Sequence, residues 1–156
     1  MQLNDSDATD IYTANADGTG TRPLTKSPGY DAEATVGPNG RIVFTSVRDG
    51  DMEIYSMNAD GSDVRRLTHR DGPDGGPFYS ADGKQIVFRG RPLQAGPELD
   101  DYRALLKKGL WRPTSLAIFV MNEDGSNLRQ VTHLKGPSFA PFFTPDGKQI
   151  IFSTNV

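Results

Sequence analysis

The chain has 156 residues, a formal net charge of −3 and no cysteine, and 24% of its residues are charged. A mildly acidic chain of this size is expected to form one domain, and it lacks the basic surface of a nucleic-acid-binding protein. Without cysteine there are no disulfides and no thiol chemistry. No apolar run is long enough to cross a membrane, and the polar stretch at residues 1–10 predicts no signal peptide in this chain.

Residues 1–7 match nothing later in the chain, and we expect them to form a frayed arm. From residue 8 onward the sequence repeats, in three series that each step by 43 residues and then by 64. The period is therefore 43, and the second step, which leads to the third copy, contains 21 extra residues. The three series are Asp17-Gly18, Asp60-Gly61 and Asp124-Gly125; Asn39-Gly40, Asp82-Gly83 and Asp146-Gly147; and Leu24-Thr25, Leu67-Thr68 and Val131-Thr132.

Apolar and polar residues alternate on both sides of these glycine pairs, which predicts β-hairpins closed by two-residue type I′ turns. Each period then holds four short strands, and the expected set is 53–58, 63–68, 76–80 and 85–89. Four antiparallel strands every 40 to 45 residues are typical of a β-propeller blade. We predict an all-β chain with three blade equivalents, arranged as two whole and two half blades, in a domain covering residues 8–156.

Several segments resemble the repeats of TolB and its relatives: N-A-D-G-S at 58–62, R-R-L-T at 65–68 and P-D-G-K-Q-I-I-F at 145–152. The resemblance implies a six-bladed propeller that acts as a protein-interaction module of the Tol-Pal envelope system. It also implies a periplasmic or extracellular location, and it brings no cofactor. A non-enzymatic scaffold is the first functional hypothesis. The second is a metal-dependent or hydrolase-associated site in the channel, because one propeller scaffold hosts unrelated activities.

The repeat begins and ends with half blades, since 10–25 holds only a third and fourth strand and 140–153 only a first and second. An exposed strand edge tends to pair with another chain, and three blades are too few to close a ring. We therefore expect two copies to form one six-bladed propeller, pairing through residues 10–25 and 140–153. The alternative is that the chain is an excised or engineered half of a longer propeller, with no ligand of its own.

The extra residues form an insertion, residues 92–114. Residues 96–109 are predicted to be a helix, with Pro97 near its start, acidic residues in its first turn and Gly109 as its C-terminal cap. Leu99, Tyr102, Leu105 and Leu106 form its apolar stripe. This stripe either packs on the helix's own or the neighbouring blade, with Leu110 and Trp111 as anchors, or serves as a lid or docking element.

Strand direction places the insertion on the face opposite the glycine turns, together with the variable loops 26–33, 69–76 and 133–140. In a closed ring these loops surround the channel mouth, and their polar side chains suit a peptide, a protein or a small ligand. The alternative is that each histidine and aspartate bonds within its own loop. Arg48, Arg89, Arg91 and Arg112 could receive an anionic group, but pairing with Asp49, Glu98 or Asp100 is favoured. The candidate binding residues are Tyr30, Asp31, Glu33, His69, Asp74, His133, Arg91 and Trp111, with no catalytic residue and no metal ligand among them.

Overall fold

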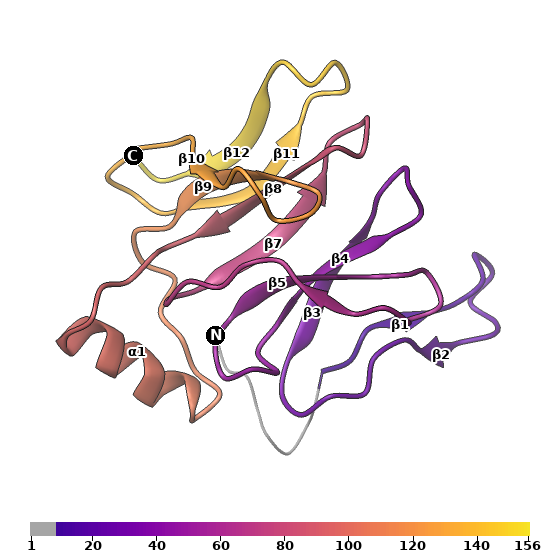
Figure 1. The fold of residues 1–156 in the computed structure, drawn as a ribbon, viewed down its shortest axis with the longest axis horizontal. Coiled ribbons are helices and arrows are strands. Elements are labelled where there is room, and N and C mark those ends of the chain that lie inside the picture. Colours follow the sequence, from indigo (N-terminus) through magenta and orange to yellow (C-terminus); the bar gives the residue numbers. More distant parts are fainter. Residues whose placement is uncertain (1–8) are drawn as a thin grey trace.

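The computed structural model describes residues 9–156, so the frayed arm expected for residues 1–7 lies outside the described part. Within this described part, twelve strands and one helix follow one another along the chain (Figure 1). The strands form two four-stranded and two two-stranded sheets, all antiparallel. The prediction of an all-β chain with one short helix is confirmed.

The two four-stranded sheets have the order that a propeller blade requires, with chain neighbours side by side. In each of them the two middle strands are almost completely buried, whereas the last strand is short and mostly exposed. The first sheet consists of β3 (Asp31–Val36), β4 (Ile42–Ser46), β5 (Glu53–Met57) and β6 (Arg65–Arg66). The second consists of β7 (Asp74–Tyr79), β8 (Gln85–Gly90), β9 (Ala117–Asn122) and β10 (Arg129–Gln130).

Two half sheets flank these blades, in the places that the repeat predicts. The hairpin of β1 (Tyr12–Thr13) and β2 (Arg22–Pro23) precedes the first blade, and β11 (Ser138–Phe143) with β12 (Ile150–Thr154) follows the second. The outer strands are shorter than the sequence predicts, with two residues instead of the six expected at 63–68. Arg65 is exposed and Arg66 is half-buried, so few packing contacts stabilise a longer strand at this edge.

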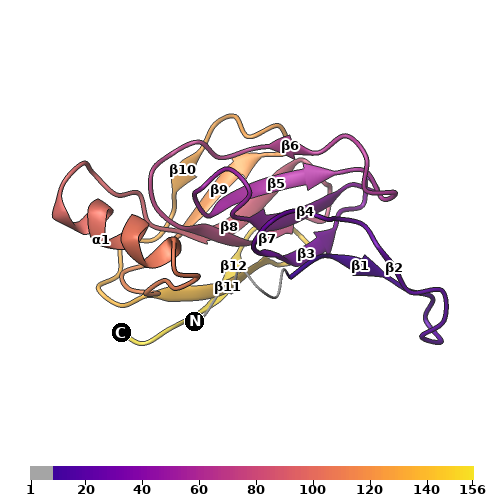
Figure 2. The same ribbon diagram turned by 90° about the horizontal axis from the view of Figure 1, so that it is seen from below.

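The sheets stack side by side, and alternate residues of each strand face opposite neighbours. Val43 and Ile54 of the first blade pack against Ile86 and Phe88 of the second. Phe44 of the first blade faces the other way, toward the β1–β2 hairpin. Figure 2 shows the short strands β6 and β10 along one side of the molecule and β3 and β11 along the other. The strands β3, β7 and β11 therefore lie at the inner side of the arc, where a propeller has its channel.

The glycine turns differ from the predicted type I′. In the turn after β5 the N–H of Gly61 donates to the carbonyl of Asn58 at 2.9 Å, and only Gly61 has a positive φ, of 88°. Such a turn is a type I turn followed by a left-handed glycine. Asp60 keeps a negative φ because its carboxylate accepts both the N–H and the hydroxyl of Ser62, at 2.9 and 2.6 Å.

The recurring threonine joins the third and fourth strands of every unit. Its hydroxyl oxygen accepts the backbone N–H of the third strand, from Ile11 to Thr25, from Ile54 to Thr68 and from Ile118 to Thr132, at 2.8–2.9 Å. In the first two copies the threonine hydroxyl also donates to a carboxylate, from Thr25 to Asp10 at 3.2 Å and from Thr68 to the buried Glu53. In the third copy Ala117 stands at the position of Glu53, so this second bond is missing.

The inserted helix α1 (Pro97–Leu106) packs on the body of the protein. Leu99 and Tyr102 are buried with Met52 of the first blade and with Trp111. The chain leaves the helix through Gly109, whose N–H donates to the carbonyl of Leu106 at 2.9 Å and whose φ is 66°. The packing interpretation of the apolar stripe and the cap at Gly109 are both confirmed.

Replacing Thr68 with Val should lower the free energy of unfolding by about 2 kcal/mol, because the Ile54 N–H and the Glu53 carboxylate both lose a buried partner. The matched control is Thr132→Val, which removes the same backbone acceptor at a half-buried site without a carboxylate. We expect the control to cost about half as much. Urea denaturation of both variants measures the difference, and equal losses would contradict the role assigned to Glu53.

Candidate functional site

The inner strands of three sheets enclose an apolar hollow. Parts of β3, β7 and β11 line it, and its volume is about 510 Å³. Trp111 and Pro113 of the inserted segment add to the lining, so the hollow lies between the inner strands and the insertion. We call it the channel hollow, and its lining residues are Glu33, Ala34, Thr35, Gly76, Phe78, Arg89, Trp111, Pro113, Phe139 and Ala140.

A β-bulge interrupts each inner strand at the hollow. Glu33, Gly76 and Ala140 occupy the same repeat position, and all three have a positive φ, of 57°, 61° and 48°. The bulge turns the Glu33 side chain toward the next blade. One Glu33 oxygen accepts the bulge N–H of Gly76 at 2.8 Å and the hydroxyl of Thr45 at 2.9 Å.

Arg89 reaches the hollow from β8. Its Nη2 donates to the other Glu33 oxygen at 2.6 Å, and only 10% of its side chain is exposed. The equivalent residue of the first blade is Thr45, since Phe44 and Phe88 correspond, so the arginine is particular to the second blade. A Cβ at Gly76 would lie 2.1 Å from Arg89 Nη1, so the glycine makes room for the guanidinium.

Residues 111–114 form a wall between the channel hollow and a second, smaller cavity under the helix. Trp111 and Pro113 face the channel hollow, while Arg112 and Thr114 face the helix. The centroid of the Trp111 ring lies 6.0 Å from the Arg89 guanidinium carbon. The indole N–H of Trp111 is buried and has no acceptor among residues 9–156.

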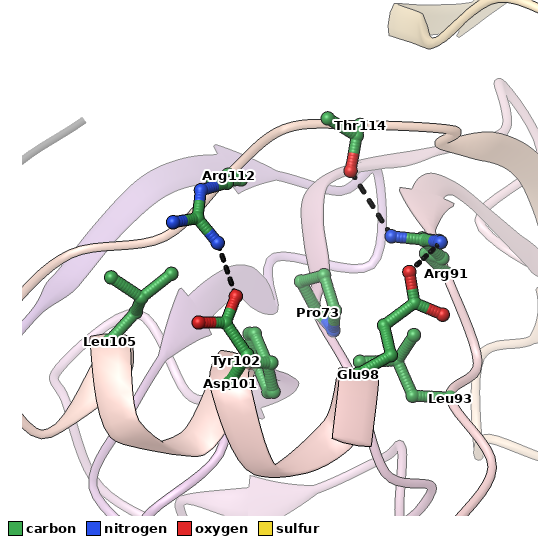
Figure 3. Close-up of a pocket in the computed structure, with 9 residues that line it drawn as sticks. All are labelled: Pro73, Arg91, Leu93, Glu98, Asp101, Tyr102, Leu105, Arg112 and Thr114. Atoms are coloured by element: carbon green, nitrogen blue, oxygen red, sulfur yellow. Dashed lines mark hydrogen bonds and ion pairs between the residues drawn. The ribbon is translucent and has the colours of Figure 1, made fainter. Parts of the chain in front are cut away.

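The second cavity has a volume of about 100 Å³ (Figure 3). Two ion pairs close it, one between Arg91 and Glu98 and the other between Arg112 and Asp101. Arg91 also donates to the Thr114 hydroxyl at 3.1 Å. These contacts tie the wall to the helix and hold Trp111 over the channel hollow.

The predicted candidates do not form one site. Glu33 and Trp111 line the channel hollow, whereas Arg91 lies in the cavity under the helix. Tyr30 packs beside the cluster that contains Trp111, and burial raises the pKa of its hydroxyl to about 12. The carboxylates of Asp31 and Asp74 are buried in ion pairs, with Arg48 at 2.8 Å and Arg70 at 2.7 Å. Asp74 pairs within its own loop, as the local-bonding interpretation predicts, whereas the arginine partner of Asp31 comes from the loop after β4.

The arginines of these pairs also cover aromatic rings. Arg48 lies 5.2 Å from the centroid of Phe44, and Arg70 lies 3.8 Å from that of Phe119. The sequence suggested Asp49, Glu98 or Asp100 as partners, which is right only for Arg91 with Glu98. Asp31, Glu33 and Asp101 pair with Arg48, Arg89 and Arg112, because contacts between strands and across the insertion override sequence proximity.

The histidines are placed apart from the hollow. His69 and His133 are exposed, and the His133 ring forms a hydrogen bond with the Gln130 side chain at 3.2 Å. Within the same residues, no group of three or more histidines and carboxylates is placed to hold a metal ion.

Eight of the ten residues that line the hollow were not predicted as binding residues, among them Arg89, Phe78 and Phe139. Arg89 was noted only as a partner for acidic side chains, and Phe78 and Phe139 were not singled out. The available signal was the repeat itself, because Arg89 departs from the threonine and serine found at its equivalents Thr45 and Ser153.

An arc of radially stacked antiparallel sheets with inner strands around a hollow defines a β-propeller domain. The model of the TolB beta propeller domain family matches residues 1–95. The chain belongs to this family.

Solved structures agree with this assignment. A putative TolB from Agrobacterium tumefaciens is 25% identical, with a TM-score of 0.70 over 94% of this chain and 50% of its own. TolB from Acinetobacter baumannii is 24% identical, with a TM-score of 0.65 over 90% of this chain and 31% of its own. Kuenenia stuttgartiensis hydrazine synthase shares the fold at 18% identity, with a TM-score of 0.68 over 92% of this chain and 24% of its own.

The chain thus spans half the length of the Agrobacterium structure and less of the other two. The comparison with curated proteins finds no match. Within residues 9–156, no helix combines the length and the apolarity that a membrane crossing needs.

Two buried carboxyls should make stability depend on pH. Burial raises the pKa of Glu53 from 4.5 to about 7 and that of Asp74 from 3.8 to about 6. The folded state therefore binds these protons more tightly than the unfolded state, and this stabilisation is lost as pH rises through the folded pKa values. We expect the free energy of unfolding to fall by on the order of 2 kcal/mol between about pH 5 and pH 8.

Urea denaturation across this range tests the expectation. Glu53→Gln should flatten the dependence, whereas Glu98→Gln, which changes an exposed carboxylate on the helix, should leave it unchanged. A free energy of unfolding that rises with pH in the unmodified protein would show that the two carboxyls are ionised more readily in the folded state.

Proposed function

We propose that this chain is a non-enzymatic propeller scaffold, which assembles as a homodimer into one six-bladed ring and binds a peptide or protein segment at the channel mouth on the insertion face. The family resemblance supports a protein-interaction role and a periplasmic or extracellular location. The paired state of Glu33 with Arg89 supports binding over catalysis, because each group already neutralises the other.

One observation carries the assembly: a cross-strand aromatic pair that is complete in both blades is divided between the chain's two ends. Phe44 stacks with Tyr55 at 5.8 Å, and Phe88 stacks with Phe119 at 5.7 Å. The equivalents in the half sheets are Phe152 on β12 and Tyr12 on β1. In a two-fold ring, β12 of one copy would pair with β1 of the other, and Phe152 would stack on Tyr12 across the seam.

Exposed apolar side chains support the same seam. Tyr12 is 59% exposed, although its equivalents Tyr55 and Phe119 are 2% and 3% exposed. Ile151 is 65% exposed, whereas Val87 at the same position of the second blade is fully buried. In the ring these two side chains would face the sheets of the other copy. Val36 is likewise exposed, at 70%, although its equivalents Tyr79 and Phe143 are buried.

The length of the Agrobacterium TolB structure is consistent with this proposal, because this chain covers half of it. Unpaired β-edges of this kind either find a partner strand or aggregate. A second copy would supply the missing neighbour strand at both edges, because its β12 would pair with β1 and its β1 with β12. A two-fold rotation of this kind closes the ring.

Sedimentation should give a mass of about 34 kDa, twice that of one 17.0 kDa chain. Ile151→Lys places a charge in the proposed seam, so this variant should sediment as a folded monomer. Val64→Lys changes an exposed valine beside β6, far from the seam, and should remain a dimer. A compact monomer formed by the unmodified chain would overturn the ring.

The pairing register can be tested with cysteines, because the chain has none of its own. Tyr12→Cys combined with Phe152→Cys should give an oxidised covalent dimer, since directly opposed residues of antiparallel strands lie within disulfide reach. Tyr12→Cys combined with Gln149→Cys is the mismatched control and should cross-link much less.

The binding role predicts that Trp111 is a main contact. Peptides selected from a random library on the unmodified protein should bind Trp111→Ala at least 10-fold more weakly, because loss of a central aromatic contact typically costs 2 kcal/mol or more. The Val64→Lys variant should bind them unchanged. Selected peptides that bind the Trp111→Ala variant equally well would place their site away from the insertion face.

A further inference from the structure

The lining of the channel hollow includes hydrogen-bond donors that no described residue accepts. Both Glu33 oxygens are engaged, by Arg89, Thr45 and Gly76. Arg89 uses only Nη2 for this contact, and its other N–H groups have no acceptor among residues 9–156. The buried indole N–H of Trp111 has none either. A ligand that complements this surface therefore brings an acceptor.

The planar geometry of the Arg89 donors favours a carboxylate as that acceptor. Arginine keeps its charge at every physiological pH, and its planar fork matches a carboxylate in two parallel hydrogen bonds. Glu33 holds one edge of the Arg89 guanidinium, and the Thr45 hydroxyl and the Gly76 N–H stabilise that carboxylate in turn. Glu33 thus acts as a positioning residue that orients the arginine, and the pair as a whole carries no net charge.

The remaining walls are apolar and largely aromatic. Phe78, Phe139, Trp111 and Pro113 surround the polar end, and the hollow has a volume of about 510 Å³. Binding sites for small molecules typically have this size and this ratio of apolar wall to convergent polar groups. Aromatic walls favour an aromatic tail, because offset or edge-to-face ring pairs add to the gain from burial.

We propose that the channel hollow is a binding site for a carboxylate that carries an aromatic tail, with Arg89 as the carboxylate anchor and Trp111, Phe78 and Phe139 as the walls. The ligand is either a small aromatic acid or the C-terminal phenylalanine or tyrosine of a peptide, which present the same chemistry. This inference rests on the proposed function, because it assigns a ligand to the channel of that scaffold.

Trp111 is the single tryptophan of the chain, so its fluorescence reports on the hollow directly. Titration with 3-phenylpropionate should change the fluorescence and saturate, with half-saturation at or below about 1 mM. The uncharged 3-phenylpropionamide has the same shape and should bind at least 10-fold more weakly. Equal binding of the amide, or no saturable change with the acid, would overturn the proposal.

Two variants test the assignment of residues. Arg89→Gln keeps an N–H donor toward Glu33 but removes the charge, and should weaken binding of the acid at least 10-fold. Ala34→Phe fills the hollow from an exposed position on β3 without altering Arg89, and should abolish the signal. Ala59→Phe makes the same change in an exposed glycine turn and should bind normally. Unaltered binding by Ala34→Phe would place the ligand elsewhere.

Further titrations distinguish the source of the carboxylate and separate this inference from the ring. Acetyl-Gly-Gly-Phe with a free C-terminus is compared with its C-terminal amide, and binding of the free acid alone identifies a peptide terminus as a competent ligand. The same titrations on the Ile151→Lys variant show whether a single chain, without its partner, binds the acid. If the protein is a monomer that binds the acid, the six-bladed ring is wrong and the ligand assignment stands. If it is a dimer that binds neither acid, the ligand assignment is wrong and the ring stands.

Discussion

The two half sheets leave backbone N–H and C=O groups on β1 and β12 without the neighbouring strand that satisfies their equivalents in the complete blades. The same strands expose apolar side chains, as Tyr12 and Ile151 show. A further antiparallel strand on each edge would both pair these backbone groups and bury these side chains. The proposed ring, its channel and the opposite wall of the hollow all depend on that pairing.

The insertion has a structural role, which is to hold Trp111 in place. Its helix is anchored by Leu99 and Tyr102, and the Tyr102 hydroxyl donates to Asp51 at 2.5 Å. The following wall is tied to the helix by the ion pairs of Arg91 and Arg112. Exposed pairs of this kind contribute little stability individually. Their effect here is positional, because they hold Trp111 over the hollow between the inner strands.

Charge is buried at the first residues of three strands, β3, β5 and β7. Asp31, Glu53 and Asp74 are each almost inaccessible and each contact an arginine. Removing one partner of such a pair would leave an uncompensated buried charge, which is far more costly than losing the pair itself. These side chains therefore belong to the scaffold, which explains why acidic residues in loops around a channel mouth were misleading as binding candidates.

The sequence by itself determined the repeat, the four-strand unit, the place of the half blades and the inserted helix with its glycine cap. These features follow from local rules: alternation along strands, glycine in turns and charge at helix ends. It also singled out Glu33 and Trp111 among the candidates, although not as neighbours. The turn type was missed because the Asp60 side chain accepts hydrogen bonds from the backbone and side chain of Ser62, a detail beyond a residue pair.

Only the tertiary structure decided which charged groups meet. Glu33 and Arg89 are 56 residues apart and belong to different blades, and a bulge at Glu33 directs one toward the other. Phe78 and Phe139 face the same hollow because inner strands of successive sheets lie side by side. Such contacts depend on the stacking of sheets in space, which has no counterpart in the spacing of residues along the chain.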